Sequence, residues 1–156
     1  MSELEIRPAT DDDLPAVLAL YGQPGMDDGV VLDIESAKAL HAKFKAYPDY
    51  TLYVAEQDGV VLGTYAMLIM DNLGHMGAPS AIVEDVNVSP EAQGKGMGSQ
   101  MIRHALDVAT AKGCYKLSLS SNMKRERAHA FYDGLGFERH GYSFLCRLNN
   151  AEASHG

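Results

Sequence analysis

Residues 86–99 read VNVSPEAQGKGMGS and decide the fold of the surrounding chain. The stretch begins as an alternating apolar strand, meets Pro90, and passes through a Gln-x-x-Gly-x-Gly turn into a helix rich in Met, Ile, Ala and Leu. A glycine-rich turn that opens a helix leaves unpaired backbone N–H groups at the positive end of the helix dipole. Glycine also removes the Cβ atoms that would keep a phosphate at a distance. The stretch therefore predicts a site where a phosphate-bearing cofactor docks.

The composition is that of an ordinary folded protein. Of the 156 residues, 46% are hydrophobic and 22% are charged, so we expect one domain over residues 1–148 and a loose tail over 149–156. The net charge of −8 argues against a nucleic-acid partner. No apolar run is long enough to cross a bilayer, no signal peptide is evident, and Cys114 and Cys146 look like free thiols. We therefore predict a cytoplasmic protein that binds no membrane and no metal.

Apolar periodicity and turn signals predict the order of strands and helices. Helices are expected to begin near residues 11, 33, 97 and 128. Asp58-Gly59 is a hairpin turn signal between two of the strands. Strands are expected at 4–7, 51–56, 60–69, 81–88 and 116–120, with a closing strand or hairpin at 137–148. The order βααβββαβαβ predicts an α/β protein with a mixed sheet and helices on both faces.

Two blocks of the sequence resemble a known family. Gln93–Gly98 is similar to the acetyl-CoA signature of the GNAT superfamily of N-acetyltransferases, and residues 128–137 resemble its second conserved block. The element order over residues 3–148 is similar to the GNAT-type acyl-CoA N-acyltransferase fold. Residues 83–86 and 113–117 resemble glucosamine-6-phosphate N-acetyltransferases, whereas 119–132 resembles aminoalkylphosphonate N-acetyltransferases.

The resemblance implies acetyl-CoA as co-substrate. Its pyrophosphate would bind the backbone N–H groups of residues 94–99, where glycine lets the phosphates approach. Asn122 is expected to bond the pantetheine arm, although the same side chain could cap the following helix. The residues expected at the cofactor are Val86, Asn87, Val88, Gln93, Gly94, Lys95, Gly96, Met97, Gly98, Ser99, Asn122, His129, Phe131 and Tyr132.

Glu84 is the predicted catalytic base. Strict alternation puts Glu84 on the face of Ile82 and Val86, and Asp85 on the opposite face with Val83. A carboxylate in an apolar strand costs desolvation unless it is paired or used. An amine acceptor must lose a proton before it attacks a thioester, and a carboxylate with a raised pKa meets that need. Asp85 is the competing candidate for base or for substrate orientation, and an ion pair is the structural alternative for Glu84.

Tyr132 is the predicted catalytic acid. The resemblance implies that a tyrosine here lies near the cofactor sulfur and protonates the departing thiolate. Its neighbour Phe131 is also expected to pack in the core. If the acceptor carries a phosphate or phosphonate, Lys124 and Arg125 are its candidate ligands.

The predicted function is transfer of an acetyl group to the primary amine of a small molecule, such as an amino sugar or aminoalkylphosphonate. Asp27, Asp28 and Asp71 in the expected acceptor loops suggest a cationic substrate. The alternatives are a protein or peptide N-acetyltransferase and a non-catalytic acyl-CoA sensor. A homodimer is possible, with the closing strand as its interface.

Overall fold

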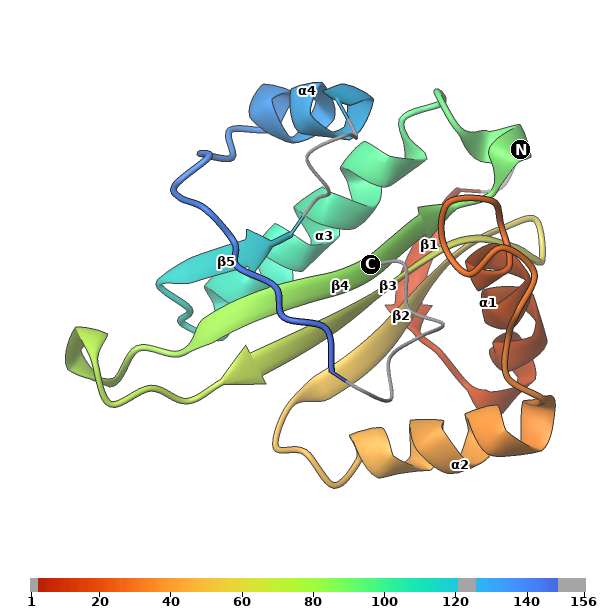
Figure 1. The fold of residues 1–156 in the computed structure, drawn as a ribbon, viewed down its shortest axis with the longest axis horizontal. Helices are drawn as coiled ribbons and strands as arrows, with labels where there is room; N and C mark the ends of the chain where they lie inside the picture. The colour runs from red at the N-terminus through yellow and green to blue at the C-terminus, as the bar shows by residue number, and fades with distance from the viewer. Residues whose placement is uncertain (1–2, 121–125, 149–156) are drawn as a thin grey trace.

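The computed structural model describes residues 3–120 and 126–148, which form a five-stranded sheet flanked by helices (Figure 1). Asn122, Lys124, Arg125 and the expected tail lie outside the described residues. The strands are β1 (Glu5–Pro8), β2 (Tyr50–Gln57), β3 (Val60–Met70), β4 (Ser80–Val88) and β5 (Lys116–Leu119). The helices are α1 (Leu14–Tyr21), α2 (Ile34–Phe44), α3 (Met97–Ala111) and α4 (Glu126–Gly134), with 3₁₀ turns at Asp11–Asp13, His75–Gly77 and Pro90–Ala92.

The sheet is mixed, as the element order predicts. Its strands follow the order β1-β2-β3-β4-β5, with antiparallel pairing up to β4 and a parallel pair between β4 and β5. Asp58 and Gly59 form the tight turn between β2 and β3 with positive φ angles of 53° and 78°. Helices α1 and α2 cover one face of the sheet, and α3 covers the other with α4 beside it (Figure 1). The predicted fold class is confirmed.

Each face of the sheet has its own apolar core. Helix α3 buries Met101, Ile102 and Ala105 completely, and Ala105 follows the other two at the helical spacing that the sequence predicts. On the other face, Val17 of α1 and Ala37 of α2 pack with Val54 of β2. Full burial of a side chain such as Val or Ile stabilises a fold by about 1.5–3 kcal/mol. The α3-side core includes Ala81 and Val83 of β4, the strand that carries most of the candidate site.

A β-bulge in β4 changes the faces that alternation predicts. The pairing of β3 with β4 shifts register between Thr64 and Ala66, and Asp85 takes a left-handed φ of 55°. Val86 consequently packs against the α3-side core, in which Val83 is buried. The expectation that Val86 shares the face of Glu84 is therefore wrong, because the bulge inserts an extra residue and reverses the alternation beyond it. The expected placement of Asp85 on the face of Val83 is wrong as well, since Asp85 interacts with Tyr21 and Tyr50 on the side of α1 and α2.

The predicted closing strand does not form. Residues 137–148 follow α4 as an extended segment without strand pairing, and Tyr142 and Phe144 are 89% and 93% exposed. Within residues 3–120 and 126–148, no strand pairs with the outer edge of β5. A strand needs a neighbour for its N–H and C=O groups and a layer to cover its apolar side chains. The alternating sequence of this segment provides neither.

Candidate active site

The glycine turn presents the open N-terminus of α3. Gly94 and Gly96 have φ angles of 78° and 84°, a region that glycine enters without strain. Gly96 is the N-cap residue, and no side chain caps the helix. The Gln100 N–H donates to the Gly96 carbonyl at 3.1 Å, so the amides of residues 97–99 precede the first helical hydrogen bond. These amides and the helix dipole form a site suited to a phosphate.

Helix α4 lies against this turn. A Cβ atom on Gly98 would lie 3.4 Å from Cζ of Phe131, so the absence of a side chain lets the two helices approach closely. Phe131 and Tyr132 both pack against the α3-side core, and the Tyr132 ring also contacts Phe137 edge-on. Tyr132 and His129 are thereby held on the same side of the sheet as the glycine turn. The side chain of Met97 is buried in the core, which leaves its backbone for ligand contacts.

Strand β4 has an open edge next to the turn. Strand β5 pairs with β4 only from Ser80 to Val83 and diverges before the bulge. The Ser89 N–H donates toward β3, to the Leu62 carbonyl at 2.7 Å, so alternation turns the backbone groups of Val86 and Val88 to the open edge. An extended chain with amide groups can bind there as a strand would. The edge leads from the bulge to the N-terminus of α3.

The bulge carries the two acidic candidates. Glu84 pairs across the sheet with Ala66, whose side chain lies in the core beneath α1 and α2. Asn87 Nδ2 donates to the Asp85 carbonyl at 3.1 Å and supports the left-handed backbone. Both carboxylates contact solvent, but the protein around them raises the pKa of each. The pKa of Glu84 is raised further by the Asp85 charge.

Acidic and aromatic groups surround Asp85. Its pKa is raised by burial and then by Asp27 of the α1–α2 loop, and Asp85 in turn raises the pKa of the mostly buried Tyr21. Tyr50 at the start of β2 has a pKa raised by burial, by Asp85 and by Glu84. The ring of Tyr50 stacks on Phe44 with centroids 3.9 Å apart. Sequence analysis missed Tyr21 and Tyr50, because no local pattern relates them to β4.

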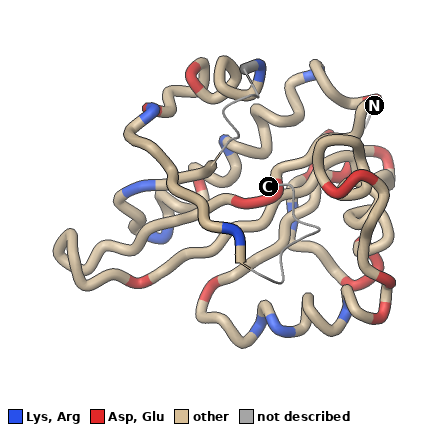
Figure 2. Tube along the Cα trace, in the orientation of Figure 1, with Lys and Arg blue, Asp and Glu red and all other residues tan. Residues whose placement is uncertain are grey.

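Several acids elsewhere in the described residues form ion pairs. Asp13 accepts two hydrogen bonds from Arg7 at 2.7 and 3.0 Å, which lower its pKa to about 2. Lys112 and Asp49 form an ion pair at 2.6 Å. In contrast, every charged group that shifts the pKa of Glu84 or Asp85 is itself acidic. Figure 2 shows acidic residues on β4 and along the α1–α2 loop, and lysines along α2. The electrostatic neighbours of the two bulge carboxylates are therefore acidic.

The predicted catalytic pair lies on opposite faces of the sheet. Glu84 is on the face of α1 and α2, whereas Tyr132 packs on the face of α3. The open edge of β4 lies between the two faces, since β5 no longer covers it there. A ligand along this edge would have the carboxylates of the bulge on one side and the residues of α4 on the other.

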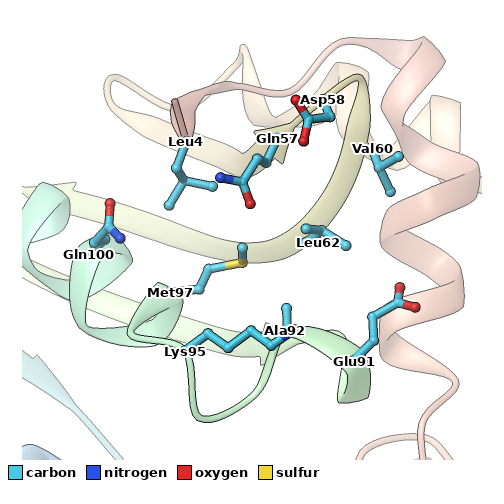
Figure 3. A pocket seen from close by; sticks show the side chains of 10 residues that line it. All are labelled: Leu4, Gln57, Asp58, Val60, Leu62, Glu91, Ala92, Lys95, Met97 and Gln100. Atoms are coloured by element: carbon cyan, nitrogen blue, oxygen red, sulfur yellow. The ribbon is translucent and has the colours of Figure 1, made fainter. Parts of the chain in front are cut away.

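A separate groove of about 500 Å³ lies behind the glycine turn (Figure 3). Leu62 and Met97 form apolar parts of its wall, and the Lys95 side chain extends toward Ala92. The groove contains none of the residues of the bulge or of α4. The Lys95 side chain thus lines this groove rather than the open edge of β4.

The described residues contain neither a metal site nor a membrane-spanning helix. In residues 3–120 and 126–148, no three His, Cys, Asp or Glu side chains are grouped to hold a metal ion. None of the helices in these ranges has the length and apolar character needed to cross a membrane.

Comparison with known proteins gives a family match over most of the chain. The acetyltransferase (GNAT) family model matches residues 19–137. The chain is 28% identical to a glucosamine 6-phosphate N-acetyltransferase from Trypanosoma brucei brucei, over 88% of this chain and 91% of that protein. It is 29% identical to an aminoalkylphosphonate N-acetyltransferase from Salmonella typhimurium, over 95% of this chain and 94% of that protein. The crystal structure of a Trypanosoma brucei acetyltransferase matches with a TM-score of 0.79 and 28% identity, over 94% of this chain and 100% of that one.

Proposed function

The chain belongs to the acetyltransferase (GNAT) family of N-acetyltransferases, and on this premise we propose that it transfers acetyl from acetyl-CoA directly to the primary amine of a small molecule. The family implies an acyl-CoA donor. The observation that carries the proposal is the meeting of three features: the open edge of β4, the uncapped amides of α3 and the carboxylates of the bulge. We take residues 1–148 as the catalytic domain.

The donor would bind through backbone groups. The pyrophosphate would accept hydrogen bonds from the amides of residues 94–99 and from the Ser99 hydroxyl. The pantetheine arm would lie along Val86, Asn87 and Val88 as an added strand. The Val86 N–H, which faces the open edge, would stabilise the oxyanion of the thioester carbonyl. Asn122, His129 and Phe131 are proposed to contact the arm from the opposite side.

Glu84 and Tyr132 would move the protons. Glu84, with its raised pKa, takes a proton from the acceptor ammonium directly or through water, and the free amine attacks the thioester carbon. The C–N bond forms, the tetrahedral intermediate collapses, and the C–S bond breaks. The departing thiolate takes a proton from the Tyr132 hydroxyl, and the proton that the acylated nitrogen still has to lose to become a neutral amide returns to the Tyr132 phenolate through water. Since amine and thioester are held side by side, positioning supplies much of the rate.

The acceptor would be an amine of positive or low net charge. Asp85 and Asp27 favour a cationic group, and the rings of Tyr50 and Phe44 can pack against its carbon skeleton. The relatives named for glucosamine 6-phosphate and aminoalkylphosphonate support a small-molecule acceptor. If this acceptor also carries a phosphate or phosphonate, Lys124 and Arg125 are the proposed ligands.

We further propose that the protein is a homodimer in the cytoplasm. The exposed apolar side chains of residues 137–148 support a homodimer. Cys114 and Cys146 are free, which supports the reducing cytoplasm.

The test is release of free thiol from acetyl-CoA with a panel of amines. The panel contains glucosamine 6-phosphate, aminoalkylphosphonates, polyamines, aminoglycosides and amino acids. We expect turnover with one class, and a drop in kcat of about 10²-fold or more in Glu84→Gln and in Tyr132→Phe. Glu35→Gln and Tyr142→Phe, which change strongly exposed side chains, serve as matched controls.

Two outcomes would count against the proposal. Full turnover in Glu84→Gln and Tyr132→Phe would remove the assigned roles. Tight acetyl-CoA binding without turnover of any panel member would favour a protein or peptide acceptor, or a non-catalytic sensor.

A further inference from the structure

Gln23 connects the acceptor side of the molecule to the donor edge of β4. It lies directly after α1, and its Nε2 donates to the Val88 carbonyl at 3.3 Å, across 65 positions of sequence. Gln93 Nε2 donates to the same oxygen at 3.1 Å. Val88 turns this carbonyl to the open edge, where the donor's arm would lie. The two glutamine side chains therefore bond the carbonyl oxygen to which an amide N–H of the arm would donate.

The loop that begins at Gln23 is a compact unit. The Gln23 carbonyl accepts hydrogen bonds from the N–H groups of Met26 and Asp28 at 3.2 and 3.3 Å. The Asp27 N–H donates to the Tyr21 carbonyl at 3.0 Å, and the Gly29 N–H donates to Gly22 at 2.9 Å. Because these bonds join the two ends of the loop, residues 22–30 would shift as one body. The side chain of Gln23 thus fixes the place of Asp27 relative to β4.

The Val88 carbonyl has no capacity for a third strong donor. A carbonyl oxygen has two lone pairs, and the two glutamine amides occupy both. An amide N–H of an arm lying on the open edge must displace one of them. Gln23 has the longer bond and is held from a different element, whereas Gln93 is anchored five positions further along the same chain segment. Gln23 is accordingly the one displaced.

We propose that Gln23 is a positioning residue that couples the donor edge to the acceptor loop. The inference rests on the proposed function, because it assumes that an acyl-CoA arm lies along β4. When the arm binds, one of its amide N–H groups donates to the Val88 carbonyl in place of Gln23 Nε2. Residues 22–30, including Asp27, can then move to fit an amine. Binding of the arm therefore changes how the acceptor loop is held against β4.

The test is amide hydrogen exchange of residues 22–30 with and without CoA. We expect CoA to speed exchange in this loop by about fivefold, because without the Gln23 anchor the opening that breaks the loop's own backbone hydrogen bonds becomes easier by about the strength of one hydrogen bond, whereas simple burial would slow it. In Gln23→Met, which keeps the length of the side chain but removes the donor, exchange should be fast without CoA and unchanged by it. The same variant should bind CoA about fivefold more tightly, because the competing amide is gone. If Gln23 had a purely structural role, Gln23→Met would change only the melting temperature.

Gln93→Ala is the matched control. It removes the other donor to the same carbonyl but leaves the loop attached, so the exchange of residues 22–30 in the free protein should stay slow. Slower or unchanged loop exchange on binding of CoA by the wild type would overturn the inference alone. Absence of CoA binding in calorimetry would overturn the proposed donor and, with it, this inference.

Discussion

Strand β4 separates two halves of the candidate site that are built in opposite ways. The donor half is contiguous in sequence, and its groups are backbone amides of the open edge and of the α3 N-terminus. The acceptor half is assembled from segments far apart in sequence, namely Tyr21, Asp27, Tyr50 and Asp85, and its groups are charged or aromatic side chains. In the proposed function, the first half binds the acyl-CoA donor through main-chain groups, whereas the second binds the acceptor through side chains, which single substitutions can change.

The two halves also differ in their effect on the stability of the folded state. Backbone amides at a helix end stay in contact with water and need no buried charge. Asp85 and Asp27, however, repel each other, and partial burial raises the pKa of Asp85. An acid whose pKa is raised by folding destabilises the folded state at neutral pH. The acceptor half therefore lowers stability, as functional sites often do.

The largest expected effect comes from Asp85→Asn. The cationic acceptor would lose the charged Asp85 carboxylate as a hydrogen-bond partner. The variant should therefore lower kcat/KM for the acceptor found in the thiol-release screen by about 10- to 100-fold. The CoA affinity should stay the same, and the melting temperature should rise because a repelled carboxylate is removed. Asn keeps the left-handed backbone at this position. Steady-state kinetics, calorimetry and thermal melts would check this, and a fall in melting temperature would contradict it.

Asp13→Asn should lower the stability of the fold and leave catalysis unchanged. The Asp13 pKa is lowered from 3.8 to about 2 by Arg7, so its ionised form contributes about 2 kcal/mol to the free energy of unfolding. That contribution is complete above about pH 4 and disappears as the pH falls through about 2. Urea unfolding at pH 7 should show the loss, with kcat unchanged. The exposed neighbour Asp12→Asn is the control, and an equal loss there would refute the assignment.

Gly96→Ala tests the donor half by itself. A side chain at a φ of 84° costs about 1 kcal/mol in backbone strain, although the Cβ would meet no atom within 4 Å. Gly59→Ala, at a φ of 78° in the β2–β3 turn, carries similar strain away from the site. Both variants should melt lower by the same amount, but only Gly96→Ala should weaken CoA binding, by about tenfold. Equal CoA affinities in calorimetry would argue against phosphate binding at this turn.

The smallest effect concerns the pH profile. Because burial and Asp85 raise the pKa of Glu84, kcat/KM should fall on the acid side at a pH above the ordinary range of glutamate. In Asp85→Asn this midpoint should move to lower pH, since the charge that raises the pKa is removed. Profiles of both proteins between pH 4 and 9 would measure the shift. An identical acid limb in Glu84→Gln would assign the limb to another group.

The donor half could be predicted from the sequence because its determinants are local. The glycine pattern at residues 93–98, the strand before it and the apolar spacing of Met101 and Ile102 all lie within one short stretch. Positive φ angles at Gly94 and Gly96 are what a glycine pattern can encode directly. Local signals of this kind need no knowledge of tertiary contacts.

The acceptor half could not be predicted in the same way. The bulge places a non-glycine residue, Asp85, in the left-handed region, and alternation therefore gave the wrong face for Val86. The approach of Tyr21 and Tyr50 to Asp85 depends on the packing of α1 and β2. Residues 137–148 alternate like a strand, but a strand forms only where the chain lays the segment alongside another strand, and alternation does not encode that placement.

The left-handed bulge has an evolutionary consequence. Asn and Gly tolerate the φ of 55° at position 85 better than most residues do, so single substitutions there can change the charge of the acceptor half without disturbing the backbone. The donor half, made of main-chain groups, would be unaffected by such a change. A descendant of this protein could thus acquire a new acceptor by drift at one position while keeping its cofactor.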